Sequence, residues 1–201
     1  MLKIIFCDKN INNLEALENQ FSDLPNITFT NADIVSVKAD CIVSPGNSYG
    51  CMDGGVDRFI NYSLNYISTT VKNMIKTKYN GEQPVGTTML IKLEKNDLSS
   101  NNWKYLAHTP TMRIPKDVST SDNAYIAFRS LLRKINSHNL KNSDKINSVV
   151  VTSFCSGAGS MKPNTSAKQM RIAYNLEMSN NDPGWNIANT IESQLASTFH
   201  R

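Results

Sequence analysis

Short apolar runs that fit β-strands alternate with segments of helical periodicity along most of this chain. Residues 149–154 (VVVTSF) are rich in β-branched side chains, and residues 41–44 (CIVS) are apolar enough for a strand that is buried on both faces. Alternation of this kind predicts an α/β fold, with helices on both faces of a mixed sheet, as one domain over residues 1–201. The expected strands are residues 2–6, 27–29, 41–44, 87–93, 103–108 and 149–154, and the expected helices are 14–21, 56–79, 121–135, 165–178 and 187–199.

The size and charge of the chain fit an ordinary globular domain. Its 201 residues, 40% of them hydrophobic, can bury a core without help from disulfides or a metal. The 21 basic and 17 acidic residues are interspersed and give a net charge of +4. This mild excess suits a phosphate-bearing ligand but is not the footprint of a nucleic-acid-binding protein. Nucleic acid is therefore not an expected partner, and we expect a monomer.

The apolar segments and the cysteines indicate where the protein works. No run approaches the roughly 18 consecutive apolar residues of a membrane span, and the N-terminus has no signal-peptide pattern. Cys7, Cys41, Cys51 and Cys155 lie far apart and in no metal-type spacing, which predicts free thiols in a reducing compartment. We therefore expect a cytoplasmic protein that is not secreted, touches no membrane and holds neither a metal nor a cofactor.

One glycine-rich loop, residues 44–57 (SPGNSYGCMDGGVD), joins an expected buried strand to an expected long helix. Glycine lets a backbone approach a ligand closely, and amides at a helix N-terminus bind anions. Gly54 and Gly55 are therefore placed to let a phosphate or a ribose come near. Asn47 and Asp57 add polar side chains, although Asn47 also fits a turn residue and Asp57 also fits a partner of the helix dipole.

A second loop of small residues, 156–163 (SGAGSMKP), follows the strand-like run 149–154 and precedes a helix. Small residues with exposed amides are what a diphosphate needs. The loop lacks the Gly-Lys-Ser/Thr ending of a P-loop and does not match the dinucleotide-binding glycine pattern. Two such strand-to-helix loops in a domain of this size indicate a ligand cleft at the carboxyl ends of the strands.

Four segments, taken in order, resemble a macro domain. They are Asp33-Ile34, the run 42–57, the PTMRIP segment at 110–115, and the loop from Ser156 followed by AKQMRIAY from Ala167. The combination resembles a less-studied branch of macro domains from bacteria, fungi and viruses. This resemblance implies a three-layer α/β/α sandwich with a mixed central sheet of about six strands, which binds ADP-ribose in a cleft at the strand ends.

The resemblance also assigns roles to single residues. Asp33 and the amide of Ile34 would hold the adenine, and Asn47 would contact the distal ribose. The residues that would lie along the distal ribose or wrap the diphosphate are Gly54, Gly55, Val56, Ser156, Gly157, Ala158, Gly159 and Ser160. Arg113 in the PTMRIP segment would either contact a phosphate or anchor its own segment through an internal salt bridge.

Two functional hypotheses follow from the resemblance. In the first, the protein hydrolyses an ADP-ribose ester on a mono-ADP-ribosylated protein, or ADP-ribose 1″-phosphate, with Asp57 and Asn47 as catalytic residues. Asp57 matches the aspartate of hydrolytic relatives, where a carboxylate could deprotonate a water. In the second, it is a non-catalytic module that binds ADP-ribose or another nucleotide, because Ser44-Pro45-Gly46 departs from the family's usual Asn-Ala-Ala start.

Three further side chains have structural explanations. Cys51 and Cys155 lie in the two loops but have no feature of an activated thiol, so we expect them to be inert. His108 ends an apolar strand, where we expect a partly buried histidine with its hydrogen bonds satisfied.

Overall fold

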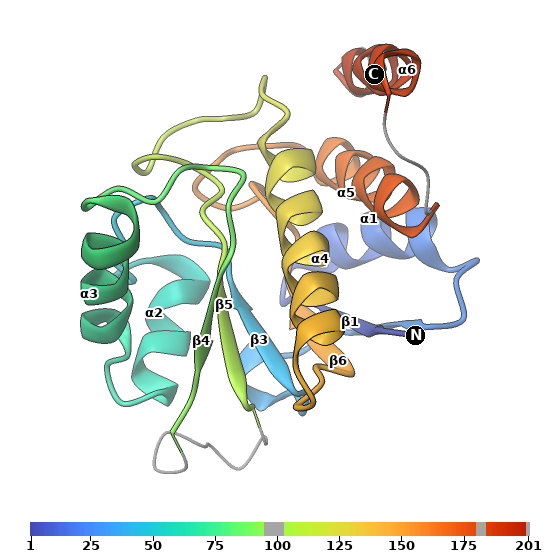
Figure 1. Ribbon diagram of the computed structural model, residues 1–201. Helices are drawn as coiled ribbons and strands as arrows, with labels where there is room; N and C mark the ends of the chain where they lie inside the picture. Colours follow the sequence, from blue (N-terminus) through green and yellow to red (C-terminus); the bar gives the residue numbers. More distant parts are fainter. Residues whose placement is uncertain (95–102, 180–183, 200–201) are drawn as a thin grey trace.

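The centre of the computed structural model, which describes residues 1–94, 103–179 and 184–199, is a mixed sheet between two helical layers (Figure 1). Within these residues the sheet has six strands in the order β2-β1-β6-β3-β5-β4. Neighbouring strands are parallel except β4 and β5, which are antiparallel. The α/β/α sandwich predicted from the sequence is confirmed. The strands are β1 (Lys3–Cys7), β2 (Ile27–Thr30), β3 (Cys41–Ser44), β4 (Met89–Lys92), β5 (Tyr105–His108) and β6 (Ser148–Val151).

The helices before residue 180 divide between the two faces of the sheet, and each layer has its own apolar core, whereas the helix at Trp185–Ser197 packs against α5 (Figure 1). On one side Phe6, Phe21 and Phe128 pack ring against ring between the sheet, α1 and α4, with α5 beside them. On the other side Ile60, Val71 and neighbouring side chains of α2 and α3 cover the sheet (Figure 1). The helices are α1 (Ile11–Phe21), the short 3-10 helix η1 (Ile34–Ser36), α2 (Gly55–Ser63), α3 (Ser68–Tyr79), α4 (Asn123–Lys141), α5 (Pro163–Met178) and α6 (Trp185–Ser197).

The inner strands read as continuous apolar runs because helices cover both of their faces. Every residue of β3 and β5 is buried. Burying one large apolar side chain contributes roughly 1.5–3 kcal/mol, so these short strands fix the sheet strongly. The expected strand over 149–154 ends earlier, at Val151, because the chain then turns into the loop that follows β6.

The predicted single helix over residues 56–79 is wrong, because the segment forms two helices, α2 and α3. Asn65 and Tyr66 between them have φ angles of 50° and 64°, a left-handed conformation that no α-helix continues through. Asn61 holds this break: its Oδ1 accepts from the amide of Ser68 at 2.9 Å, and its carbonyl accepts from the amide of Tyr66 at 2.8 Å. The apolar spacing runs on through buried Leu64, so periodicity could not reveal the break.

The parallel strands β1, β6, β3 and β5 all point their carboxyl ends to one edge of the sheet. The loops that leave these four strands therefore meet there, at the place where open α/β sheets bind their ligands.

Candidate functional site

A cavity of about 460 Å³ opens at this edge of the sheet. Its volume falls in the range of small-molecule sites. Four loops build its wall, and they follow the parallel strands β1, β3, β5 and β6. The wall residues are Asp8, Lys9, Asn10 and Asn13 after β1; Pro45, Gly46, Asn47 and 52–57 after β3; Thr111, Met112 and Pro115 after β5; and Thr152, Ser153 and 155–159 after β6.

The loop after β3 delivers a helix N-terminus to the cavity. Gly54 is the N-cap residue of α2, and no side chain caps its first turn. Gly55 has a φ of 53°, in the left-handed region that favours glycine. The first amides of α2 therefore lack a side-chain acceptor, and an anion in the cavity can satisfy them.

Asp57, in the first turn of α2, is one of the carboxylates of this wall, with Asp8 and Asp53. Its Oδ1 accepts a 2.8 Å hydrogen bond from the hydroxyl of Ser44 at the end of β3. Burial among protein atoms raises the pKa of Asp57 to about 6, and the nearby charge of Asp53 acts in the same direction. The hydrogen bond from Ser44 opposes this shift. The result is a carboxyl that can exchange a proton near neutral pH.

The side chain of Asn47 stabilises a turn through its oxygen and leaves its Nδ2 donor available. Its Oδ1 accepts from the amide of Tyr49 at 3.0 Å, as expected of a turn residue. In the described part of the chain its Nδ2 has no protein acceptor, and Asn47 lines the cavity. A side chain that is 9% exposed is thus held by one end and offers the other to a ligand.

The loop after β6 forms a further part of the wall. A Cβ added at Gly157 would meet no atom within 4 Å, whereas one at Gly159 would lie 2.5 Å from the carbonyl oxygen of Cys155. Gly159 is therefore needed for close backbone packing, while Gly157 borders open space in the cavity. The amide of Val118 donates to the carbonyl of Gly159 at 2.9 Å and fixes the loop from outside.

The structure brings most of the predicted site residues to the cavity and leaves four outside its wall. Asp33 caps η1 through the amide of Val35, and its Oδ2 pairs at 2.6 Å with Lys9, which is itself a wall residue. Ile34, Ser160 and Arg113 are also not wall residues. The predicted residues that do line the cavity are Asn47, Gly54, Gly55, Val56, Asp57, Ser156, Gly157, Ala158 and Gly159.

Arg113 forms an internal salt bridge, which was one of its two expected roles. Its Nε donates to Oε1 of Glu82 at 2.6 Å, and its Nη2 donates to Oε2 at 2.9 Å and to the hydroxyl of Tyr49 at 2.9 Å. This guanidinium lowers the pKa of the Glu82 carboxyl to about 2. Arg113 thus anchors the PTMRIP segment to the turn before β4.

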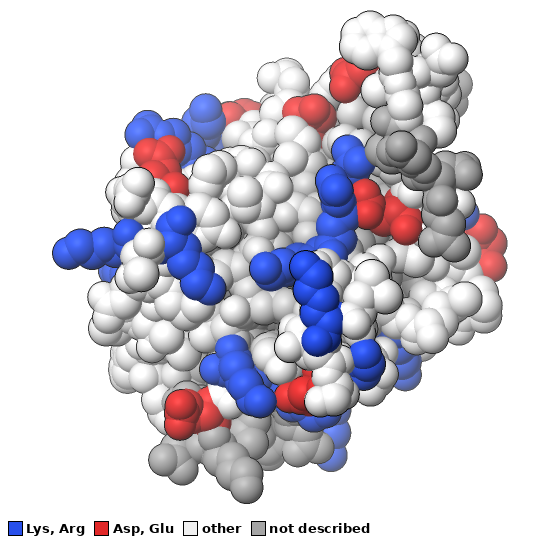
Figure 2. All heavy atoms as spheres, in the orientation of Figure 1, with Lys and Arg blue, Asp and Glu red and all other residues white. Residues whose placement is uncertain are grey.

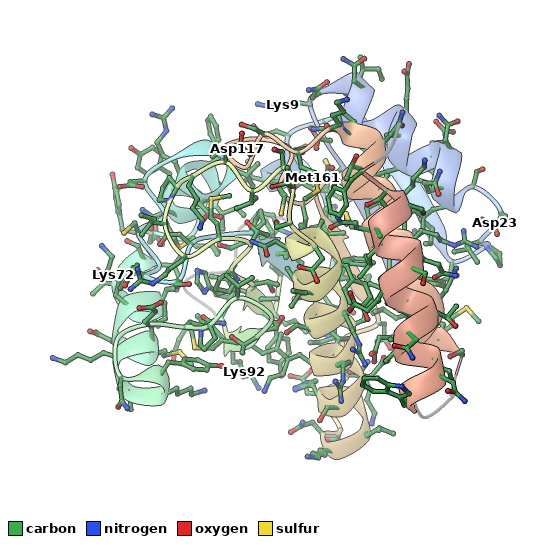
Figure 3. The ribbon with its side chains drawn as sticks, turned by 90° about the horizontal axis from the view of Figure 1, so that it is seen from above. Lys9, Asp23, Lys72, Lys92, Asp117 and Met161 are labelled. Atoms are coloured by element: carbon green, nitrogen blue, oxygen red, sulfur yellow. The ribbon has the colours of Figure 1, made fainter. Side chains whose placement is uncertain are left out.

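The loop after β1 also contributes to the wall, which the sequence patterns did not predict. Lys9 lies at the start of α1, beside the loop that follows β6 (Figure 3). Asp8 links these two loops, because its Oδ2 accepts from Nδ2 of Asn13 at 3.1 Å and from the amide of Ser153 at 3.4 Å. The available signal was the position of Asp8 and Lys9 directly after a strand.

The expectation for His108 is wrong. The side chain is fully buried, and although its Nδ1 lies 2.8 Å from Oε1 of Gln83, its Nε2 has no partner among the residues that the structure describes. Burial lowers the pKa of His108 to about 4, so the ring is neutral at physiological pH. The expectation for Cys155 fits the structure better: burial raises the pKa of this thiol to about 12.

Neither a metal centre nor a membrane span is seen in the described residues. Residues 1–94, 103–179 and 184–199 contain no group of three or more His, Cys, Asp or Glu side chains that could hold a metal ion. They also contain no helix with the length and apolar character to cross a bilayer. Figure 2 shows Lys and Arg side chains over α4 with acidic side chains next to them, in keeping with the mixed charges of the sequence.

A six-stranded mixed sheet between helical layers, with a ligand-sized cavity at its carboxyl edge, defines an α/β/α domain of the macro type. Residues 6–194 match the family model of the macro-like domain, and the chain belongs to this family. The resemblance inferred from the sequence is confirmed.

Several solved structures have the same fold. The macrodomain of Mycobacterium tuberculosis DarG is 18% identical, with a TM-score of 0.59 over 75% of this chain and 90% of that chain. A mutant Oceanobacillus iheyensis macrodomain with ADPR is 15% identical, with a TM-score of 0.58 over 85% and 91%. Thermosipho africanus DarTG in complex with ADP-ribose is 14% identical, with a TM-score of 0.56 over 94% and 55%. At these identities the similarity establishes the shared fold.

Proposed function

We propose that this protein binds ADP-ribose in the cavity at the carboxyl edge of its sheet. The observation that carries the proposal is the uncapped N-terminus of α2, which lines one cavity together with residues 155–159. A diphosphate between them would accept hydrogen bonds from both backbones. Membership of the macro-like family, and the complex of Thermosipho africanus DarTG with ADP-ribose, support this choice of ligand.

The side chains beside the diphosphate site suggest where the adenine and the distal ribose of the ligand would lie. Asp33 and the amide of Ile34 would take the adenine, next to Lys9, whose ion pair with Asp33 fixes the carboxylate. Asn47 and Asp57 would take the distal ribose, because both lie in the loop after β3 or the helix that follows it. Ser160 would add to the diphosphate loop.

We further propose that the bound ADP-ribose derivative is hydrolysed. The substrate would be an ester on a mono-ADP-ribosylated protein or ADP-ribose 1″-phosphate. A pKa of about 6 makes Asp57 mostly ionised at neutral pH and still a competent base. The oxygen of water would bond to the distal ribose carbon or to the acyl or phosphoryl centre of its ester, and the bond from that centre to the leaving oxygen would break. The water proton would pass to Asp57 and from there to the leaving oxygen, while Asn47 would hold the ribose. We also propose that the protein is a monomer in the cytoplasm, folded as one domain over residues 1–201.

A non-catalytic ADP-ribose-binding module is the alternative. The observation that favours it is the pair Pro45 and Gly46, which forms part of the wall where hydrolytic relatives carry alanines. The loop after β6 also offers Gly159 and Ser160 where relatives often place an aromatic ring against the distal ribose.

Release of ADP-ribose separates the two functions. Wild-type protein is incubated with a glutamate-linked mono-ADP-ribosylated protein and with ADP-ribose 1″-phosphate. We expect turnover that is lost in Asp57→Asn and kept in Glu15→Gln, a carboxylate-to-amide change at an exposed position of α1 outside the cavity wall. Binding of ADP-ribose without turnover on either substrate would favour the binding module, and equal turnover in wild type and Asp57→Asn would remove Asp57 from the chemistry.

A further inference from the structure

His108, at the carboxyl end of β5, carries a buried acceptor that nothing in the described part of the protein uses. The side chain is fully buried, and Nε2 has no hydrogen-bond partner in the described residues. Leaving a buried polar atom unpaired costs about 1–3 kcal/mol, so such an atom requires an explanation.

The hydrogen-bond network around Gln83 decides which ring nitrogen holds the proton. Nε2 of Gln83 donates to the carbonyls of Thr87 and His108, at 3.3 Å each. This orientation points Oε1 of Gln83 at Nδ1 of His108, 2.8 Å away. An amide oxygen only accepts, so Nδ1 carries the proton and Nε2 of the neutral ring is an unprotonated acceptor.

The unused acceptor faces Asp57 across Gly46. A Cβ placed on Gly46 would lie 2.7 Å from Nε2 of His108 and 2.9 Å from Oδ2 of Asp57, so these two atoms are at most 5.6 Å apart. Only a residue without a side chain leaves this gap open. Oδ1 of Asp57 is bonded to Ser44, which leaves Oδ2 as the oxygen that can carry a proton toward His108.

Few other charges reach this pair. β3 presents Ser44 and β4 presents Met89 beside His108, while α2 presents Asp57. Asp53 is a further negative charge near Asp57. Within the described part of the chain, no cation contributes to the pKa of either group. Nε2 of His108 is therefore the neighbouring atom that can stabilise a protonated Asp57 as a hydrogen-bond acceptor.

We propose that His108 is a positioning residue: Nε2 accepts a hydrogen bond from one bridging water, which in turn accepts the Oδ2 proton of Asp57 in a hydrogen bond. This inference rests on the proposed hydrolysis for its functional meaning. A proton taken from the attacking water would move to Oδ2 of Asp57 and be held there by His108, which leaves the carboxyl ready to return it to the leaving group. His108 is not a wall residue of the cavity, so it acts through Asp57.

NMR resonances of the histidine ring nitrogens test the coupling between His108 and Asp57 and do not require turnover. The chain has three histidines, and His108 is assigned from the signals that disappear in His108→Asn. We expect Nδ1 to stay protonated from pH 5 to 8, and the Nε2 resonance to shift as pH falls through about 6, where Asp57 takes up its proton. In Asp57→Asn, whose amide can donate permanently, the Nε2 resonance should not change with pH. An Nε2 resonance that is constant in wild type, or that titrates equally in Asp57→Asn, overturns the proposal.

Turnover adds a second readout that a merely structural histidine would not move. The amide of Asn in His108→Asn can still donate to Gln83 but has no group at the Nε2 position. We expect about tenfold slower turnover or more, with ADP-ribose binding within about twofold of wild type. The acid limb of the pH profile should shift to lower pH, because a protonated Asp57 loses its acceptor.

The two readouts keep the proposals separate. If no substrate is hydrolysed but the Nε2 resonance follows Asp57, the hydrolase proposal fails while the His108–Asp57 coupling stands. If turnover depends on Asp57 while His108→Asn has the wild-type rate and pH profile, the role of His108 fails and the hydrolase proposal stands.

Discussion

Ser44 donates its hydroxyl hydrogen to Oδ1 of Asp57 at 2.8 Å, which ties the end of a central strand to the first turn of α2. The sequence departs from the usual macro-domain run at Ser44, and the departure has this physical consequence. A hydroxyl bond to the ionised carboxylate opposes the effect of burial on its pKa. Ser44 therefore tunes the one carboxylate that we place in the chemistry.

Removing that hydroxyl should shift the titration of Asp57. In Ser44→Ala the ionised carboxylate loses its donor, so we expect its pKa to rise above the wild-type value of about 6. Carboxyl carbon NMR of Asp57 across pH 4 to 8 measures the midpoint directly, and the acid limb of turnover should move to higher pH with it. A midpoint equal to or lower than that of wild type contradicts the role given to Ser44.

Asp57→Asn should make the protein more stable at neutral pH. Burial raises the folded-state pKa from 3.8 to about 6, so the folded state binds the proton more tightly than the unfolded state. The contribution of this carboxyl is therefore fully present below about pH 4 and is lost as the pH rises to about 6. We expect Asp57→Asn to gain about 3 kcal/mol at pH 7.5 and about 1 kcal/mol at pH 4.5.

Urea unfolding at the two pH values measures this difference. Glu15→Gln, at an exposed position of α1 outside the cavity wall, serves as the control and should show no such pH-dependent gain. A variant at position 57 that is less stable than wild type at pH 7.5 would show that the ionised carboxylate has a favourable partner that the structure lacks.

Filling the cavity at Gly157 should block the ligand and spare the fold. A side chain there points into open space, and the φ angle of Gly157 is not in the left-handed region. We expect Gly157→Val to weaken ADP-ribose binding at least about tenfold, which is the effect of losing about 1.4 kcal/mol. Gly184→Val, at another glycine whose Cβ would meet no atom, is the matched control and should bind normally. Similar binding by both variants would mean that the diphosphate does not pass Gly157.

Arg113→Gln tests whether the PTMRIP arginine reaches the ligand. Its guanidinium is engaged by Glu82 and Tyr49 outside the cavity wall. We expect the dissociation constant for ADP-ribose to stay within about twofold of wild type in calorimetric titrations, since surface ion pairs contribute little beyond their own segment. A loss of tenfold or more would instead place Arg113 on a phosphate.

Glycine made the two main loops visible in the sequence. Gly54, Gly55 and Gly157 stand out because their frequency exceeds what simple turns require, and the ends of parallel strands meet by geometry. The loop after β1 gave a weaker signal, because Asp8 and Lys9 are residue types that commonly end a strand. Its place in the wall depends on the strand order, with β1 beside β6, which local patterns do not encode.

The hydrogen bonds that set the protonation of Asp57 and His108 were harder to predict, because they also depend on how distant segments are arranged. Ser44 meets Asp57 across 13 positions of sequence, and Gln83 meets His108 across 25. The first contact depends on where the loop after β3 places the start of α2, and the second depends on the pairing of β4 with β5. The break between α2 and α3 was hidden for a different reason, since apolar spacing persists through a turn that only backbone conformation reveals.

Binding of ADP-ribose in the cavity at the carboxyl edge of the sheet underlies every functional prediction above. It can be measured by calorimetric titration of wild type and of Asp33→Ala with ADP-ribose, with ADP and AMP as comparison ligands. We predict saturable binding of ADP-ribose that is tighter than that of ADP or AMP and that weakens in Asp33→Ala, because the carboxylate beside Lys9 is lost. Absence of ADP-ribose binding at millimolar concentration would contradict this claim and leave a macro fold whose cavity serves another ligand.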